Sequence, residues 1–141
     1  MAIVVIFINS ISYAGPYTDD LTKCIIESTT QADRIAFVKW MFYAISMHPA
    51  VKSHASISEE QINKASENVT KLLMKLLTES CREKAKKAVK YEGQLAIQNS
   101  FQTLGQVAAQ EIFTNPEVAK VMSDLEKYID GEQLKSSLEI K

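Results

Sequence analysis

The sequence predicts an all-α fold, a single-domain bundle of five or six helices around a buried central helix at about residues 31–47. Three observations lead to this prediction. Apolar residues recur at three- and four-residue spacing through most of the chain, which is the period of an amphipathic helix. No stretch of alternating polarity is long enough for a strand. Only four Gly and three Pro interrupt the 141 residues, a length that suits one domain with a single core.

The first fourteen residues, "MAIVVIFINSISYA", are almost wholly apolar and carry no charged side chain. A membrane-spanning helix needs about 20 apolar residues, so we expect no integral membrane span here. A secretory leader fits better, because Ser12 and Ala14 would stand three and one residues before a cut at Gly15. The segment lacks the Lys or Arg of a usual leader, which leaves an apolar helix packed on the domain as the alternative. The expected parts of the chain are a signal peptide at 1–14, a helical domain at 15–130 and a frayed tail at 131–141.

The first helix of the domain is expected over residues 18–28. Thr18 is placed as its cap, and Asp19 and Asp20 lie in the first turn, where carboxylates oppose the positive helix end. This helix would turn Leu21, Cys24 and Ile25 inward.

The second helix is the predicted centre of the bundle. Thr30 and Asp33 have the spacing of a capping box, and Pro49 ends the helix. Between them the sequence is apolar on nearly every side, which is typical of a buried helix.

The remaining helices follow the same logic. Ser58 and Gln61 form a second expected capping box for a helix that runs to about Ser80, and a further helix starts at Cys81 and stops at Gly93. Helices over 94–113 and 116–130 complete the bundle. The apolar face of the last helix, expected to point inward, consists of Val118, Val121, Met122, Leu125 and Ile129.

The charge of the chain is nearly balanced, with 16 basic and 17 acidic residues and a net charge of -1. This balance argues against nucleic acid as the principal partner, because phosphate binding needs a strong positive field. One local surplus of positive charge stands out in "REKAKKAVK". Such a helix face either contacts an anionic surface, lipid or protein, or is an ordinary solvated face. The candidate contact residues are Arg82, Lys86, Lys87 and Lys90.

The helix over 94–113 has a polar face rich in amides, with Glu111 as its only charge. Exposed helix faces normally carry ions, so an uncharged face suggests close contact with a neighbour. That neighbour is either another helix of the same chain or a partner, including a second copy. The candidate interface residues are Gln98, Gln102, Gln106 and Gln110.

No catalytic constellation is visible, and we expect neither enzymatic function nor a cofactor or bound metal. The chain has no G-x-S-x-G turn to present a nucleophilic serine. His48 and His54 flank a loop and lack the four-residue spacing with which two imidazoles bind zinc. The acidic pairs Asp19–Asp20 and Glu59–Glu60 lie at helix starts, where capping explains them.

The expected oxidation state of the two cysteines, Cys24 and Cys81, depends on the compartment. In an oxidising compartment an even pair in a small domain is most simply a disulfide, whereas in the cytoplasm two buried reduced thiols are the better interpretation. No CxxC motif is present, so nothing indicates a redox-active pair.

Three stretches, "DDLTKCIIESTTQADRIAFVKWMFYAISMHP", "ESCREKAKKAVKYEG" and "LGQVA", resemble a group of uncharacterised signal-bearing proteins of Gram-negative bacteria. The resemblance covers most of residues 17–130. It implies export to the periplasm and a disulfide between Cys24 and Cys81, and it implies no activity.

The function expected from these observations is that of an exported interaction module, periplasmic or secreted, which binds a protein partner or itself. The alternative is a carrier of a small apolar ligand, because the Phe, Met and Trp residues at 37–47 could line a cavity as well as fill a core.

Overall fold

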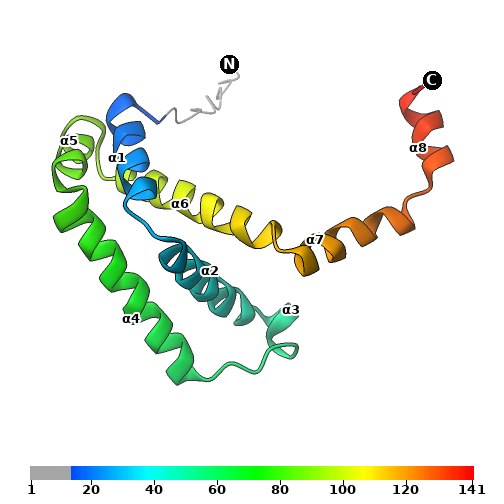
Figure 1. Cartoon of the computed structure of the whole chain (residues 1–141), viewed down its shortest axis with the longest axis horizontal. Coiled ribbons are helices and arrows are strands. Elements are labelled where there is room, and N and C mark those ends of the chain that lie inside the picture. Colours follow the sequence, from blue (N-terminus) through cyan, green and yellow to red (C-terminus); the bar gives the residue numbers. More distant parts are fainter. Residues whose placement is uncertain (1–13) are drawn as a thin grey trace, which may run out of the picture.

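The computed structural model describes residues 14–141, and within this range every regular element is helical (Figure 1). The predicted all-α single domain with one disulfide is confirmed. There are more helices than predicted because α3 and α8 are short additional ones. The α-helices are α1 (Pro16–Glu27), α2 (Gln31–Ser46), α3 (Pro49–Lys52), α4 (Glu59–Lys75), α5 (Arg82–Glu92), α6 (Leu95–Phe113), α7 (Pro116–Ser123) and α8 (Gly131–Leu138). A π turn, η1 (Leu76–Ser80), follows α4, and a 3-10 turn, η2 (Asp124–Tyr128), follows α7.

Two of the predicted helix starts are confirmed as capping boxes. The Thr30 hydroxyl accepts a hydrogen bond from the Asp33 N–H, and the Asp33 carboxylate accepts one from the Thr30 N–H. Ser58 and Gln61 make the same reciprocal pair at the start of α4. Both boxes join residues three apart, so the local sequence determines them.

The start of α1 differs from the prediction. The helix begins at Pro16 with Gly15 as its N-cap, and Thr18 lies inside the first turn with 2% of its surface exposed. Proline suits the first helical position because its missing N–H would have no partner there. The side chain that caps α1 is Glu92, which comes from the end of α5.

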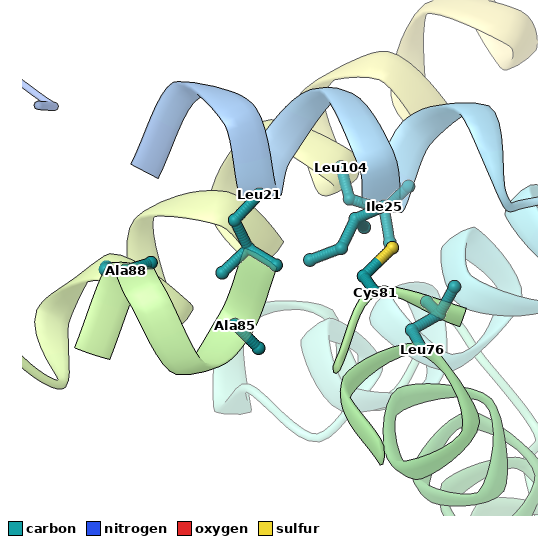
Figure 2. Close-up of a cluster of buried hydrophobic side chains, with 8 residues drawn as sticks. Leu21, Ile25, Leu76, Cys81, Ala85, Ala88 and Leu104 are labelled. Atoms are coloured by element: carbon teal, nitrogen blue, oxygen red, sulfur yellow. The ribbon is translucent and has the colours of Figure 1, made fainter. Parts of the chain in front are cut away.

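The main core lies where α1, η1, α5 and α6 meet, and Figure 2 shows its side chains converging between α1 and α5. Small alanines on α5 and α6 allow the helices to approach closely around the larger leucines and isoleucine. The buried members are Leu21, Ile25, Leu76, Cys81, Ala85, Ala88, Ala96 and Leu104.

A second, smaller core joins α2 to α4 and α6 through Phe37, Val38, Val69 and Ala108. The prediction that α2 is the buried centre of the bundle is wrong. α6 has that place, since it contacts α1, α2, α5 and α7, whereas α2 has neighbours only in α3, α4 and α6. Within residues 14–141 no element covers the remaining side of α2, so part of its apolar surface is exposed there.

The last three elements form a projecting C-terminal arm, defined here as α7, η2 and α8. In Figure 1, α7 continues away from the bundle and α8 lies at the far end. α7 contacts only α6 and η2, and α8 contacts no other element of the described chain. The apolar face predicted to point inward is therefore uncovered. The predicted frayed tail contains α8, capped by the Asp130 side chain.

Residues 1–13 lie outside the described range, and with them almost all of the predicted signal peptide. Among the residues that are described, no helix is long and apolar enough to cross a membrane.

Candidate functional surfaces

The disulfide between Cys24 and Cys81 holds α1 against the junction of η1 and α5. Its Cα atoms are 5.9 Å apart, although 57 positions separate them in sequence. The Cys81 N–H donates to the Leu76 carbonyl at 2.8 Å, five residues back. This wider turn adds a residue to the helical path and turns Cys81 toward α1.

A groove of about 940 Å³ lies beside this junction, between η1, α5 and the first turns of α6. Its inner surface is apolar and is formed by buried and half-buried side chains. These are Leu77, Ala85, Val89 and Ile97. The groove, called here the α5 groove, is open to solvent along its length.

The four basic residues singled out from the sequence, Arg82, Lys86, Lys87 and Lys90, all line the α5 groove and are all exposed. Lys86 lies 3.9 Å from Glu83, the only acidic residue of the lining, in a pair that is largely exposed and weak. In the described chain, Arg82, Lys87 and Lys90 form no ion pair within 4.0 Å. The groove therefore combines an apolar floor with a positive rim.

The predicted amide-rich face of α6 is exposed to solvent at Gln98, Gln102, Gln106 and Gln110. These residues recur every four positions and form one stripe along the helix. The neighbouring small residues point the other way: Gly105 and Ala108 are buried against α2. The sequence left packing of this amide stripe on a helix of the same chain as one alternative, and no helix of residues 14–141 packs on it.

The exposed side of α2 carries three large apolar residues, called here the α2 stripe: Ile35, Phe42 and Ile45. They lie at positions i, i+7 and i+10 and therefore share a helix face. Ile45 is 63% exposed and Phe42 is 55% exposed.

The C-terminal arm carries a run of apolar side chains that no other part of the described chain covers. Val121, Met122 and Leu125 follow the three- and four-residue spacing of one helix face, and more than half of each side chain is exposed. Other apolar residues continue along the arm. They are Tyr128, Ile129, Leu134 and Leu138. Contiguous exposed apolar surface of this kind marks binding sites in folded proteins.

The histidines take part in no metal-binding group. The Nδ1 atom of His48 accepts a hydrogen bond from the Ala50 N–H at 3.2 Å, so this side chain caps the short α3. Within residues 14–141 no three His, Cys, Asp or Glu side chains are arranged to hold a metal ion.

Sequence reasoning missed Glu92, whose carboxylate accepts from the N–H groups of Tyr17 at 2.9 Å and Thr18 at 2.8 Å and from the Thr18 hydroxyl. Desolvation opposes ionisation, but these hydrogen bonds outweigh it and hold the pKa of Glu92 below its usual value. Gly15 makes room for the carboxylate, because a Cβ there would lie 2.2 Å from Oε1 of Glu92. No local signal reveals this cap, since its partners lie 74 and 75 residues away.

The ion pair between Arg34 and Glu111 was also missed. The Arg34 Nε donates to the Glu111 Oε1 at 2.6 Å, and the two side chains are 19% and 28% exposed. The pair ties the start of α2 to the end of α6. Its one sequence signal is that Glu111 is the lone charge on an otherwise uncharged helix.

Comparison with known proteins adds no relative. No protein-family profile, curated protein or solved structure matches this chain.

Proposed function

We propose that this protein is an exported interaction module whose binding element is the C-terminal arm and whose partner is a second copy of the chain. The observation that carries this proposal is the uncovered apolar face of the arm, of which Val121 is 68% exposed and Leu125 62% exposed. A helix with such a face buries it against another surface when one is present. Among the described elements of one copy, the arm contacts only α6, through α7.

The same chain offers a second uncovered apolar surface, the α2 stripe. The arm does not fold back onto the α2 stripe of its own chain: no contact joins α7, η2 or α8 to α2. The Asn115 side chain caps the start of α7 by accepting from the N–H groups of Glu117 and Val118. Two copies related by a twofold axis could each place an arm on the α2 stripe of the other. The dimer would then have two identical contacts that bury both arms and both stripes, and the assembly would be closed.

The charges around the two surfaces are complementary. Residues 35–58, around the α2 stripe, contain Lys39 and Lys52 and no Asp or Glu. The arm, residues 116–138, contains five carboxylates and three lysines. Opposite charge around matching apolar surfaces favours this pairing over a contact between two arms, in which like charges would meet.

The surface area of the chain supports burial in an assembly. It exposes 11272 Å², whereas a compact monomer of 15.8 kDa exposes about 7,300 Å². The uncovered C-terminal arm contributes to this difference. A stable dimer of standard size buries about 1,600 Å² in total.

Light scattering during size-exclusion chromatography tests the proposal on the purified chain. We expect a dimer. Val121→Glu with Leu125→Glu should give a monomer with unchanged helix content, because both side chains are exposed within one copy. Each lost apolar contact is worth about 1.5–3 kcal/mol, so dimerisation should weaken about 100-fold or more.

The matched control adds the same two charges to the amide stripe, as Gln102→Glu with Gln106→Glu, and should leave the dimer intact. A wild-type chain that stays monomeric at high micromolar concentration would contradict self-association. A dimer broken by the control and unaffected by the arm variant would place the interface on the amide stripe instead.

Export is supported by the apolar leader-like segment and by the disulfide, a bond that persists in oxidising compartments. Expression of the full chain in a Gram-negative host should place the protein in the periplasmic fraction, with an intact mass that begins at Gly15. Recovery of the uncut chain from the cytoplasm would contradict export and leave the interaction proposal standing.

A further inference from the structure

The α5 groove combines two features that, taken separately, favour different kinds of ligand. Its floor is apolar, formed by Leu77, Ala85, Val89 and Ile97, and its volume of about 940 Å³ lies within the range of small-molecule sites. Its rim carries four cationic side chains and one carboxylate, Glu83. A ligand that satisfies both properties has an apolar body and an anionic head.

Other ligand classes use only part of the groove. A wholly apolar molecule would stay exposed to water along the open side and would make no use of the cations. A free phosphate or sulfate would contact the lysines and leave the apolar floor wet. A membrane surface is flat, whereas the apolar residues here lie below the charged rim, with Ala85 buried and Val89 half-buried. A single acyl chain can reach the floor while its head remains at the rim.

We propose that the α5 groove binds a monomeric long-chain carboxylate, with the hydrocarbon tail along Leu77, Val89 and Ile97 and the carboxylate between the rim cations. Lys86 and Lys90 are the central head-group contacts, because both line the groove and, at i and i+4, share one face of α5. Hydrogen bonds between ammonium groups and a carboxylate are charge-assisted and therefore among the stronger ones. The long lysine side chains extend to solvent and can close over a bound head group.

The disulfide sets the shape of this groove. Leu77 and Thr78 belong to η1 and the other wall belongs to α5, and the two elements meet at Cys81, which is bonded to Cys24 on α1. The groove is therefore pre-formed in the oxidised protein, so little ordering is needed when the ligand binds. This site shares no residue with the arm or the α2 stripe, and the inference is independent of the proposed self-association.

Isothermal titration of the purified, oxidised chain with dodecanoate, below its micelle concentration, tests the proposal. We expect one site per chain. Chemical-shift changes in a heteronuclear NMR spectrum should centre on Leu77, Val89 and Ile97. Two ligand controls separate the contributions of head and tail: dodecyl maltoside, which has the tail without the charge, and acetate, which has the charge without the tail. Both should bind at least tenfold more weakly.

The charge-reversal variant Lys86→Glu with Lys90→Glu should weaken dodecanoate binding at least tenfold. The matched control, Lys23→Glu with Lys64→Glu, makes the same change in net charge on exposed parts of α1 and α4 and should bind as the wild type does. Circular dichroism checks that both variants remain helical.

Three results would overturn the proposal. The first is equal binding of dodecanoate and dodecyl maltoside, and the second is equal weakening by the two charge variants. The third is binding only to vesicles that contain phosphatidylglycerol, with none to dodecanoate, which would make the basic face a membrane contact.

Discussion

The bundle and the C-terminal arm are both helical, but they are stabilised in different ways. The bundle around α1, α5 and α6 has a disulfide and a buried core. It also has a helix cap from a distant part of the sequence, because Glu92 of α5 caps the start of α1. Within the described residues the arm contacts the bundle only at α6, and otherwise it has its own caps and i,i+3 ion pairs such as Lys127 with Asp124. Helix content alone therefore does not show where the stability of the molecule lies. Substitutions should be costly in the bundle and nearly neutral in the arm of a single copy.

The largest effect should come from the disulfide. On the chain-entropy model, a crosslink across 57 positions stabilises the fold by about 4 kcal/mol. Replacing both cysteines by serine should lower the free energy of unfolding, measured in urea, by roughly that amount. A loss below about 1 kcal/mol would mean that the bundle is held by packing alone.

A matched pair of leucine truncations compares the two regions directly. Leu104 is 0% exposed in the main core, and Leu125 is 62% exposed on the arm. Leu104→Ala should cost about 3 kcal/mol, whereas Leu125→Ala should change stability by less than about 0.5 kcal/mol. Urea denaturation at a concentration where the chain is monomeric measures both values. Equal costs would contradict the distinction between bundle and arm.

A pair of glycine substitutions extends the comparison to the backbone. Gly93, between α5 and α6, has φ 86° and ψ 178°, a conformation that an L side chain rarely adopts. Gly131, at the start of α8, has an ordinary φ and open space around it. Gly93→Ala should destabilise the protein by about 1–3 kcal/mol. Gly131→Ala should be neutral, and thermal unfolding of the two variants checks this.

The smallest expected effect is a pH dependence in the bundle. The pKa of Glu92 is lowered in the folded protein, so its contribution to stability is present above the unfolded pKa of about 4.3 and is lost as the pH falls through the folded pKa. Between pH 5 and pH 3 the midpoint of thermal unfolding should therefore fall further in the wild type than in Glu92→Gln. If the unfolding midpoints of the two proteins fell in parallel with pH, the ionised carboxylate of Glu92 would contribute nothing to stability.

Gly15→Ala provides an independent check of the same cap, because the new Cβ would displace the Glu92 carboxylate. The effects of Gly15→Ala and Glu92→Gln should not add in the double variant, since both remove one interaction.

The features that sequence analysis predicted correctly are those that neighbouring residues determine. The capping boxes at Thr30 and Ser58 each join residues three apart, and the all-α class follows from apolar spacing. The start of α1 was misplaced at Thr18 because the group that caps it lies 74 and 75 positions away, on Glu92. Contacts of that range depend on the tertiary arrangement and leave no local pattern.

Burial was predicted less well than helicity. Periodicity identified the apolar face of 116–130 but could not show that no other part of the described chain covers it. It also placed α2 at the centre, although residues 14–141 cover α2 on one side only. The basic residues of α5 were recognised as a charged stretch. The apolar floor between them became apparent only when η1 and α6 were placed beside α5.

Exchange of arms between two copies is tested most directly by mixing two monomeric variants. Val121→Glu with Leu125→Glu disables the arm, and Phe42→Glu with Ile45→Glu disables the α2 stripe. Each variant loses both contacts of its own dimer. In the mixture, the intact arm of the α2 variant can still bind the intact α2 stripe of the arm variant, so one of the two contacts is restored. Sedimentation equilibrium should show a heterodimer in the mixture and monomers in each separate sample. Because the heterodimer keeps one contact of two, it should form at higher concentrations than the wild-type dimer does. A mixture that shows no heterodimer at the highest concentration at which each separate variant is still monomeric would contradict the pairing of arm and α2 stripe.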